Sequence, residues 1–256
     1  MPMDLQIVEA ARRLARARRV TVLTGAGVSA ASGVPTFRGA RGLWKSYRPE
    51  DLATPEAFRA NPVLVWEWYA WRRQLVSECR PNRAHEVLAA WSRRFPGFVL
   101  ITQNVDGLHE QAGTRGVVRF HGSLWEMRCA GRCGRAWEDR RVPLPVMPPR
   151  CETCGNLARP GVVWFGEAIP EGALERAGRA ADCDVFLSIG TSSAVWPAAG
   201  LVRDAAGHGA WTLGINPERT PLSEAVDLTI QGPAEDVLDR IDRLLEERPG
   251  EERRAR

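Results

Sequence analysis

The sequence contains no uninterrupted apolar run close to the roughly 20 residues that a membrane-spanning helix needs. It also has no apolar signal core with a cleavage site near Met1. The formal net charge is only +4 for 256 residues, which does not by itself indicate a nucleic-acid partner. These absences argue against a helical membrane protein. We expect a cytoplasmic protein that has no membrane partner and does not require nucleic acid.

Basic residues crowd the first stretch with a helical pattern, from Leu5 to Arg19. A mitochondrial transit peptide would share this feature, but such peptides are poor in acidic residues, and Asp4 lies just before the stretch and Glu9 within it. Apolar residues recur at helical spacing at Leu5, Val8, Ala11 and Leu14. We therefore interpret the stretch as a first structural helix whose core-facing stripe is formed by these four residues.

Four of the six cysteines fall in two close pairs, Cys129 with Cys133 and Cys151 with Cys154. The spacers within the pairs are three and two residues long, and 17 residues separate the pairs. In a reducing compartment this pattern favours one structural zinc ion held by four thiolates over redox-active disulfides. Four thiolates leave no open coordination position, so we expect this metal to take no part in catalysis.

Short β-rich runs alternate with segments of helical period along most of the chain. The runs cover Val20 to Thr24, Phe98 to Thr102, Val185 to Ile189, Trp211 to Ile215 and Leu228 to Ile230, and the helical segments cover Ala84 to Arg94, Glu171 to Ala181, Pro197 to Ala206 and Ala234 to Leu245. The alternation predicts an α/β fold with a Rossmann-like parallel sheet that carries helices on both faces. Ligands of such sheets bind beyond the carboxyl ends of the strands.

Two segments interrupt this alternation and predict a smaller lobe, one helical and one a zinc ribbon. We expect a single catalytic domain over residues 1–256, with the large lobe formed by residues 1–38, 81–124 and 161–248, and the small lobe by residues 39–80 and 125–160.

A glycine turn follows the first predicted strand directly, at Gly25, Ala26, Gly27 and Ser29. Small residues would let the backbone approach a phosphate while amide hydrogens point at it. Glycines in such a turn also serve purely conformational needs, and Ala30 replaces the third glycine of the dinucleotide fingerprint. The turn alone therefore leaves nucleotide binding open, including binding by a nicotinamide-dependent oxidoreductase.

Polar residues follow several of the other predicted strands. Gln103, Asn104 and Asp106 would meet a ribose or an amide there, although Asn and Asp also cap turns. His121 precedes Gly122 and titrates in the range that suits a general base, whereas a lone histidine is more often structural. Later strands end at Gly190, Thr191, Ser192 and at Asn216.

Longer motifs occur in a fixed order: GAGVSAASGVPTFRG from residue 25, TQNVDGLHEQAG at 102–113, HGSLWEMRC at 121–129, GVVWFGE at 161–167, GTS at 190–192 and GIN at 214–216. This succession closely resembles the catalytic core of the sirtuins and spans nearly the whole chain. The resemblance implies an NAD-dependent protein-lysine deacylase. In that reaction the acyl oxygen attacks C1′ of the nicotinamide ribose, nicotinamide leaves, and free lysine and O-acyl-ADP-ribose are formed.

The resemblance also implies roles for individual residues. His121 is the general base, and Asn104 is the second catalytic residue. NAD⁺ would be bound by Gly25, Ala26, Gly27, Ser29, Phe37, Arg38, Gln103, Asn104, Asp106, Gly190, Thr191, Ser192, Asn216 and Ala234, with Phe37 and Arg38 in a lid. Val162 and Phe165 match the strand that pairs with an acyl-lysine protein substrate, although ordinary core burial competes for the valine.

The helical stretch from Val63 to Val76 places Tyr69 and Arg72 on one face. A guanidinium beside a phenol binds carboxylates, and this pair resembles the signature of class III sirtuins, which prefer succinyl-, malonyl- or glutaryl-lysine. Thr36 supports the same class, whose bacterial-type members also remove acetyl groups. The alternative is an amphipathic helix that leaves Arg72 and Arg73 in solvent and buries Leu64, Trp68, Trp71 and Leu75.

Two other functions remain open. Mono-ADP-ribosyl transfer uses the same nicotinamide-releasing step, so the sequence separates it poorly from deacylation. A zinc-ribbon module that binds nucleic acid would need a basic patch, and arginines flank the cysteines at Arg128, Arg132, Arg135, Arg140 and Arg141.

Overall fold

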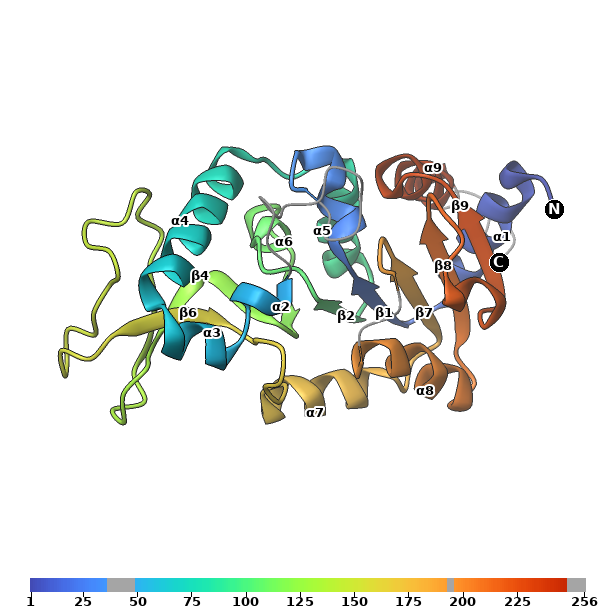
Figure 1. The fold of residues 1–256 in the computed structure, drawn as a ribbon. Coiled ribbons are helices and arrows are strands. Elements are labelled where there is room, and N and C mark those ends of the chain that lie inside the picture. The colour runs from blue at the N-terminus through green and yellow to red at the C-terminus, as the bar shows by residue number, and fades with distance from the viewer. Residues whose placement is uncertain (36–48, 193–195, 248–256) are drawn as a thin grey trace.

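The computed structural model describes residues 1–35, 49–192 and 196–247. Its larger lobe (Figure 1) is built on a six-stranded sheet. The strands lie in the order β3-β2-β1-β7-β8-β9, and every neighbouring pair is parallel. Their bounds are β1 Arg19–Thr24, β2 Gly97–Thr102, β3 Val118–Arg119, β7 Val185–Ile189, β8 Trp211–Asn216 and β9 Leu228–Gln231. The chain order reverses between β1 and β7, which is where sheets of this kind bind ligands.

Helices cover both faces of this sheet. Helices α1 (Met3–Arg16), α5 (Arg83–Arg94) and α9 (Ala234–Glu247) pack on one face, and α7 (Glu171–Ala180) and α8 (Leu201–Gly207) pack on the other (Figure 1). Strand β7 shows why both faces need a cover, since Leu187 contributes to one core and Phe186 to the other. A strand buried on both sides needs an almost continuous apolar sequence. The predicted fold class is confirmed.

The stripe predicted for the first helix is confirmed at Ala11 and Leu14 and wrong at Leu5 and Val8. Leu5 and Val8 are exposed, whereas the helix buries Ile7, Ala10, Ala11 and Leu14. Helix α1 packs in one core with α9, and this contact selects the face that turns inward. The apolar residues on neighbouring faces made two helical phases compatible with the same sequence.

A second, three-stranded antiparallel sheet forms most of the small lobe together with short helices and one long helix. Its strands, in the order β5-β4-β6, are β4 Gly122–Cys129, β5 Ala136–Glu138 and β6 Ala158–Val162, and the helices are α2 Pro49–Leu52, α3 Pro55–Ala60 and α4 Pro62–Glu78. A third apolar core lies between them. The boundaries of the two lobes remain our proposal.

Local sequence signals place the start of the long helix α4. Pro62 occupies its first turn, where its fixed φ and missing amide hydrogen suit a helix start. The Asn61 side chain accepts a hydrogen bond from the Leu64 amide at 3.0 Å, so one of the free amides of the first turn has a partner. No helix in the described ranges is long and apolar enough to cross a membrane.

Candidate functional site

The glycines of the first turn make room for a second turn across the sheet. A Cβ atom at Gly25 or Gly27 would lie 2.8 or 2.7 Å from backbone atoms at Gly190, and Gly190 itself has φ +61°. The Gly27 amide donates to the Gly190 carbonyl at 2.8 Å. Glycine is therefore needed here because two backbones touch at the point where strand order reverses. Ala26 opens the 3₁₀ turn η1 (Ala26–Ser32) that follows β1.

A buried polar network lies beneath this turn. The Asn104 amide donates to the Gly25 carbonyl at 3.0 Å and to Ser29 Oγ at 3.2 Å, and Ser29 Oγ donates to Asp106 Oδ2 at 2.8 Å. The second Asp106 oxygen accepts the Leu108 amide at 2.9 Å. Burial raises the pKa of Asp106, while these hydrogen bonds oppose the rise. The structure thus brings together Gly25, Ser29, Asn104 and Asp106.

A second group of predicted residues meets at Thr191. The Gln103 amide donates to Thr191 Oγ1 at 3.0 Å, and the Asn216 amide donates to the Thr191 carbonyl at 2.9 Å. Ser192 is the next residue and is half-buried. These contacts join the ends of β2, β7 and β8 at one edge of the sheet.

Ala234 begins helix α9 and is buried, while the nearby Gly232 amide donates to the Asn216 carbonyl at 3.2 Å. The start of α9 therefore lies next to the end of β8. Phe37, Arg38 and Thr36 lie outside the described residues, so the lid prediction stays a prediction.

His121 is held in one orientation by the backbone of the same sheet edge. Its Nδ1 lies 3.1 Å from the Gln103 carbonyl oxygen. A carbonyl only accepts, so Nδ1 carries the hydrogen of the neutral ring and Nε2 keeps its lone pair. Burial lowers the pKa of His121, partly offset by the bond to Gln103. The ring is therefore neutral at pH 7 and able to accept a proton.

Two buried histidines and two threonines extend this region, and none of the four was predicted from the sequence as a site residue. Thr24 Oγ1 bonds Thr102 Oγ1 at 2.9 Å and lies 3.0 Å from His109 Nε2. The ring centroids of His85 and His109 are 4.7 Å apart, and His85 Nε2 lies 3.4 Å from Ser29 Oγ. Burial lowers the pKa of both histidines to about 3. The sequence contains only four histidines, and this scarcity was the one signal that could have pointed to His85 and His109.

The structure buries both members of the pair on α4. Tyr69 is 1% exposed and Arg72 is 7% exposed. The Arg72 guanidinium lies 4.7 Å from the centre of the Trp68 ring and 5.6 Å from that of Tyr69. Burial lowers the pKa of Arg72, while Tyr69 and Asp106 favour its charged form, which places Arg72 within electrostatic reach of the buried network.

The amphipathic alternative with solvated arginines is wrong. Arg73 is only 1% exposed, and Leu64, Trp71 and Leu75 are only partly buried. The helix instead buries Val65, Trp66, Trp68, Tyr69, Arg72, Arg73 and Val76. Apolar residues are found all around helix α4, so the sequence did not determine which face of the helix turns toward the core.

The predicted peptide-binding strand behaves differently at its two positions. Val162 is buried in the small-lobe core and lies opposite Gly122 in the β4–β6 ladder. Any contact of Val162 with a peptide would therefore be made by its backbone. Phe165 is 48% exposed, and its amide donates to the Ala53 carbonyl at 2.9 Å.

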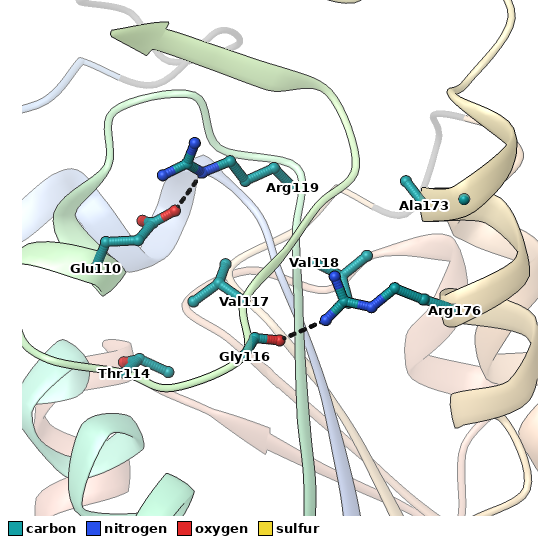
Figure 2. Close-up of a pocket in the computed structure, with 9 residues that line it drawn as sticks. Glu110, Thr114, Gly116, Val117, Val118, Arg119, Ala173 and Arg176 are labelled. Atoms are coloured by element: carbon teal, nitrogen blue, oxygen red, sulfur yellow. Dashed lines mark hydrogen bonds and ion pairs between the residues drawn. The ribbon is translucent and has the colours of Figure 1, made fainter. Parts of the chain in front are cut away.

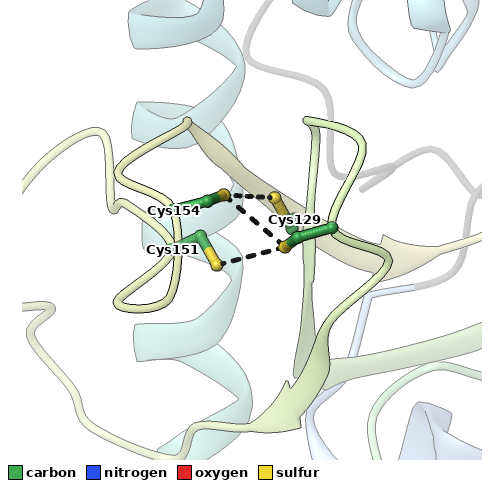
Figure 3. A group of neighbouring side chains, drawn as sticks. Cys129, Cys151 and Cys154 are labelled. Atoms are coloured by element: carbon green, nitrogen blue, oxygen red, sulfur yellow. Dashed lines mark hydrogen bonds between the residues drawn. The ribbon is translucent and has the colours of Figure 1, made fainter.

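The four paired cysteines converge, as Figure 3 shows for three labelled members. All four sulfur atoms lie within 4.8 Å of one another, and the closest contacts are 3.4 Å for Cys129–Cys154 and 3.5 Å for Cys133–Cys154. A tetrahedral zinc with bonds of about 2.3 Å needs sulfur atoms about 3.8 Å apart. The donor set and its spacing fit a structural Zn²⁺.

A separate pocket of about 560 Å³ lies between the segment around β3 and helix α7 (Figure 2). Arg119 pairs with Glu110 at 2.6 Å, and Arg176 donates to the Gly116 carbonyl at 3.0 Å. Both guanidinium groups therefore have partners within the lining. The predicted site residues do not line this pocket.

Comparison with known proteins agrees with this geometry. Residues 25–197 match the model of the Sir2 family. The chain belongs to this family, the sirtuins. An NAD-dependent protein deacylase of Aquifex aeolicus is 49% identical over 90% of this chain and 97% of its own length. One from Thermus thermophilus is 51% identical over 88% of this chain and 90% of its own length.

Solved structures of sirtuins share the fold. A Sir2 homologue in complex with NAD superposes with a TM-score of 0.89 at 45% identity and covers 94% of each chain. A mutant Sir2 homologue in complex with 2′-O-acetyl ADP ribose gives the same TM-score at 44% identity, over 93% of this chain and 96% of its own. A third, bound to a myristoylated histone peptide, gives 0.77 at 31% identity, over 95% and 98%.

Proposed function

We propose that this sirtuin is an NAD-dependent protein-lysine deacylase that removes succinyl or malonyl groups as well as acetyl groups. The observation that carries the deacylase proposal is the position of His121. A neutral imidazole, fixed through Nδ1 by the Gln103 carbonyl, stands at the same sheet edge as the buried network of Asn104 and Asp106. Deacylation needs a base at that edge, because a ribose hydroxyl must lose its proton.

The residues of the site divide the work between them. NAD⁺ supplies nicotinamide as a leaving group and an ADP-ribose that accepts the acyl group. His121 Nε2 takes the proton, and the Nδ1 bond to Gln103 stabilises the resulting cation. Asn104 is oriented by two hydrogen bonds, to the Gly25 carbonyl and to Ser29. Because its side-chain amide is already oriented, little free energy is needed to reorganise it when substrate binds.

The remaining NAD⁺ contacts in this proposal follow the same edge. Gly25, Ala26, Gly27 and Ser29 lie at the end of β1, and Gln103, Asn104 and Asp106 follow β2. Gly190, Thr191 and Ser192 follow β7, Asn216 ends β8 and Ala234 opens α9.

The acid-acyl preference rests on Tyr69 and Arg72. The Tyr69 oxygen accepts a hydrogen bond from Trp164 Nε1 at 2.9 Å, which leaves its own hydroxyl hydrogen to donate. Burial raises the pKa of Tyr69 to about 12, so the phenol stays protonated. A desolvated guanidinium beside a phenol donor is complementary to the terminal carboxylate of a succinyl or malonyl group.

The substrate class in this proposal is an acyl-lysine in a protein. Phe165 follows β6 and is half exposed. It comes two residues after Val163, whose amide donates to the His121 carbonyl at 3.0 Å, so this segment runs beside His121. An extended peptide would pair with the backbone around Val162 and Phe165. We also place the reaction in the cytoplasm, because a four-thiolate zinc site requires reduced cysteines.

The first test incubates the purified protein with NAD⁺ and matched acetyl- and succinyl-lysine peptides. Nicotinamide, free lysine peptide and O-acyl-ADP-ribose should form in equal amounts. In Arg72→Met, desuccinylation should fall by about 10²-fold while deacetylation changes little, because one charged hydrogen-bonding partner is lost. Removal of acetyl groups alone would reject the acid-acyl preference. Nicotinamide release with ADP-ribosylated protein as product would instead indicate mono-ADP-ribosyl transfer.

A nucleic-acid function has less support. Four of the five arginines that flank the cysteines form ion pairs with neighbouring acids, as in Arg128–Glu126 at 2.7 Å and Arg135–Glu152 at 3.6 Å. Arg140 and Arg141 pair with Glu138 and Asp139. A surface whose charges are matched locally offers little field to a phosphate backbone.

A further inference from the structure

The helix that carries the acyl-reading pair is attached to the zinc-ribbon sheet by one buried cation. Arg73 Nη1 donates to the Leu124 carbonyl at 2.6 Å, and Nη2 donates to the Asp139 carbonyl at 2.6 Å and to the Arg141 carbonyl at 3.2 Å. The Asp139 carboxylate lies 3.5 Å from Nη2. The guanidinium also lies 5.1 Å from the centre of the Trp125 ring. One side chain of α4 thus contacts β4 and the segment after β5.

These acceptors lie at the open end of the β4–β5 hairpin. The ladder pairs Glu126 with Glu138, so Leu124 and Asp139 flank its last described pair. The opposite end of the hairpin holds Cys129 and Cys133, two of the four zinc ligands. A zinc ion bound by the four cysteines would therefore close one end of the hairpin, and Arg73 joins the two strands at the other.

Two more side chains of α4 fasten the same face. Trp66 Nε1 donates to the Ala158 carbonyl of β6 at 2.7 Å, and Tyr69 accepts from Trp164. Residues 66, 69 and 73 are three and four positions apart, so they project from one side of the helix. Arg72 projects about 100° away from Arg73. Any rotation of α4 that frees Arg73 turns Arg72 through the same angle.

Stability alone is a poor reason for this arrangement. Arg73 Nε is buried and has no hydrogen-bond partner among the described residues, and burial lowers the pKa of Arg73. A well-packed apolar residue is often at least as stabilising as a buried ion pair. The planar guanidinium of Arg73, however, can make its hydrogen bonds to these fixed carbonyl oxygens at only one rotation of α4 about its axis. Apolar contacts at the same place would tolerate several rotations of the helix.

We propose that Arg73 is a positioning residue for acid-acyl recognition, setting the rotation of α4 that presents Arg72 and Tyr69 to the substrate carboxylate. This inference rests on the proposed desuccinylase function. It predicts a loss of acyl selectivity, because an acetyl group has no carboxylate to misalign. A purely structural role would instead lower both activities in parallel.

The test compares kcat/KM for matched succinyl- and acetyl-lysine peptides in the wild-type protein, Arg73→Lys and Asp139→Asn. Lysine keeps the charge but loses the fork, so Arg73→Lys should lower the succinyl-to-acetyl ratio by about tenfold, mainly through a higher KM for the succinyl peptide. Arg59→Lys is the matched control, since Arg59 is exposed on α3. The control should keep the wild-type ratio.

The outcomes separate the two proposals. An unchanged ratio in a folded, zinc-containing Arg73→Lys protein would overturn the positioning role and leave the desuccinylase function intact. If Arg73→Lys does not fold, Asp139→Asn decides, because it keeps the backbone acceptors of Arg73. Its ratio should fall by about threefold, and an unchanged ratio overturns the role. A wild-type protein that removes acetyl but no succinyl groups refutes the acid-acyl preference and this inference together, and leaves the deacylase function intact.

Discussion

The two sheets hold their functional groups by different means. In the six-stranded sheet, Asn104 is fixed by hydrogen bonds to the Gly25 carbonyl and to Ser29, Ser29 also donates to the Asp106 carboxyl group, and Gly190 touches Gly27 directly. In the three-stranded sheet, the functional groups are held in place by four thiols and by the buried cation Arg73. The first arrangement is complete when the chain folds. The second depends on a metal ion and on charges that are costly to bury alone.

Removing the zinc should give the largest effect and separate the two sheets. Cys151→Ser breaks the thiolate set, and a structural zinc contributes on the order of 10 kcal/mol to folding. Hydrogen exchange should lose protection over β4 to β6 but keep it over β7 and β8. Cys183→Ser, which changes a buried thiol outside the cluster, should retain the zinc. Equal loss of protection in both sheets would contradict the comparison.

Removing the base should affect chemistry alone. His121→Ala should lower turnover by about 10²- to 10⁴-fold and leave zinc content and melting temperature near the wild-type values. In the wild-type protein, kcat/KM should fall as the pH drops through the pKa of His121, which burial holds below 6.5. An acid limb centred well above that value would count against His121 as the base.

The backbone contact between the two turns can be tested with one methyl group. In Gly190→Ala the new Cβ would lie 2.5 Å from the Val28 nitrogen at φ +61°. We expect a loss of about 3 kcal/mol in the free energy of unfolding, measured by urea titration. Gly172→Ala is the control, because nothing lies within 4 Å of its Cβ position. A neutral Gly190→Ala would show that the turns are not locked together.

The buried histidine pair predicts a pH dependence of the stability of the large sheet. The pKa values of His85 and His109 lie at about 3, below their ordinary 6.5, so the unfolded chain binds more protons between these values. Stability is complete above pH 6.5 and falls by about 1.4 kcal/mol per pH unit for each histidine as the pH drops. His109→Gln should flatten urea midpoints measured from pH 7 to 5, and an unaltered slope would refute this.

Much of the large sheet followed from sequence patterns. The predicted run from Val185 to Ile189 is β7 itself, and β1 begins one residue before the predicted Val20. The segment from Pro197 to Ala206 was less predictable, because a 3₁₀ turn, η2 (Ala198–Gly200), precedes α8. A strand that is buried on both faces has a continuous apolar sequence, which makes it easy to predict. The start of a helix depends instead on local backbone hydrogen bonds.

The sequence by itself determined which residues are able to form the site: the thiol pairs, the glycine turns, the polar residues after each strand and His121. Tertiary structure alone decided the face of α1 and α4 that turns inward, the burial of Arg72 and Arg73, and the pairing of His85 with His109. Strand ends and short spacers are local properties, so a pattern fixes them. The inward face of a helix, and the partners of a buried charge, depend on elements distant in the chain.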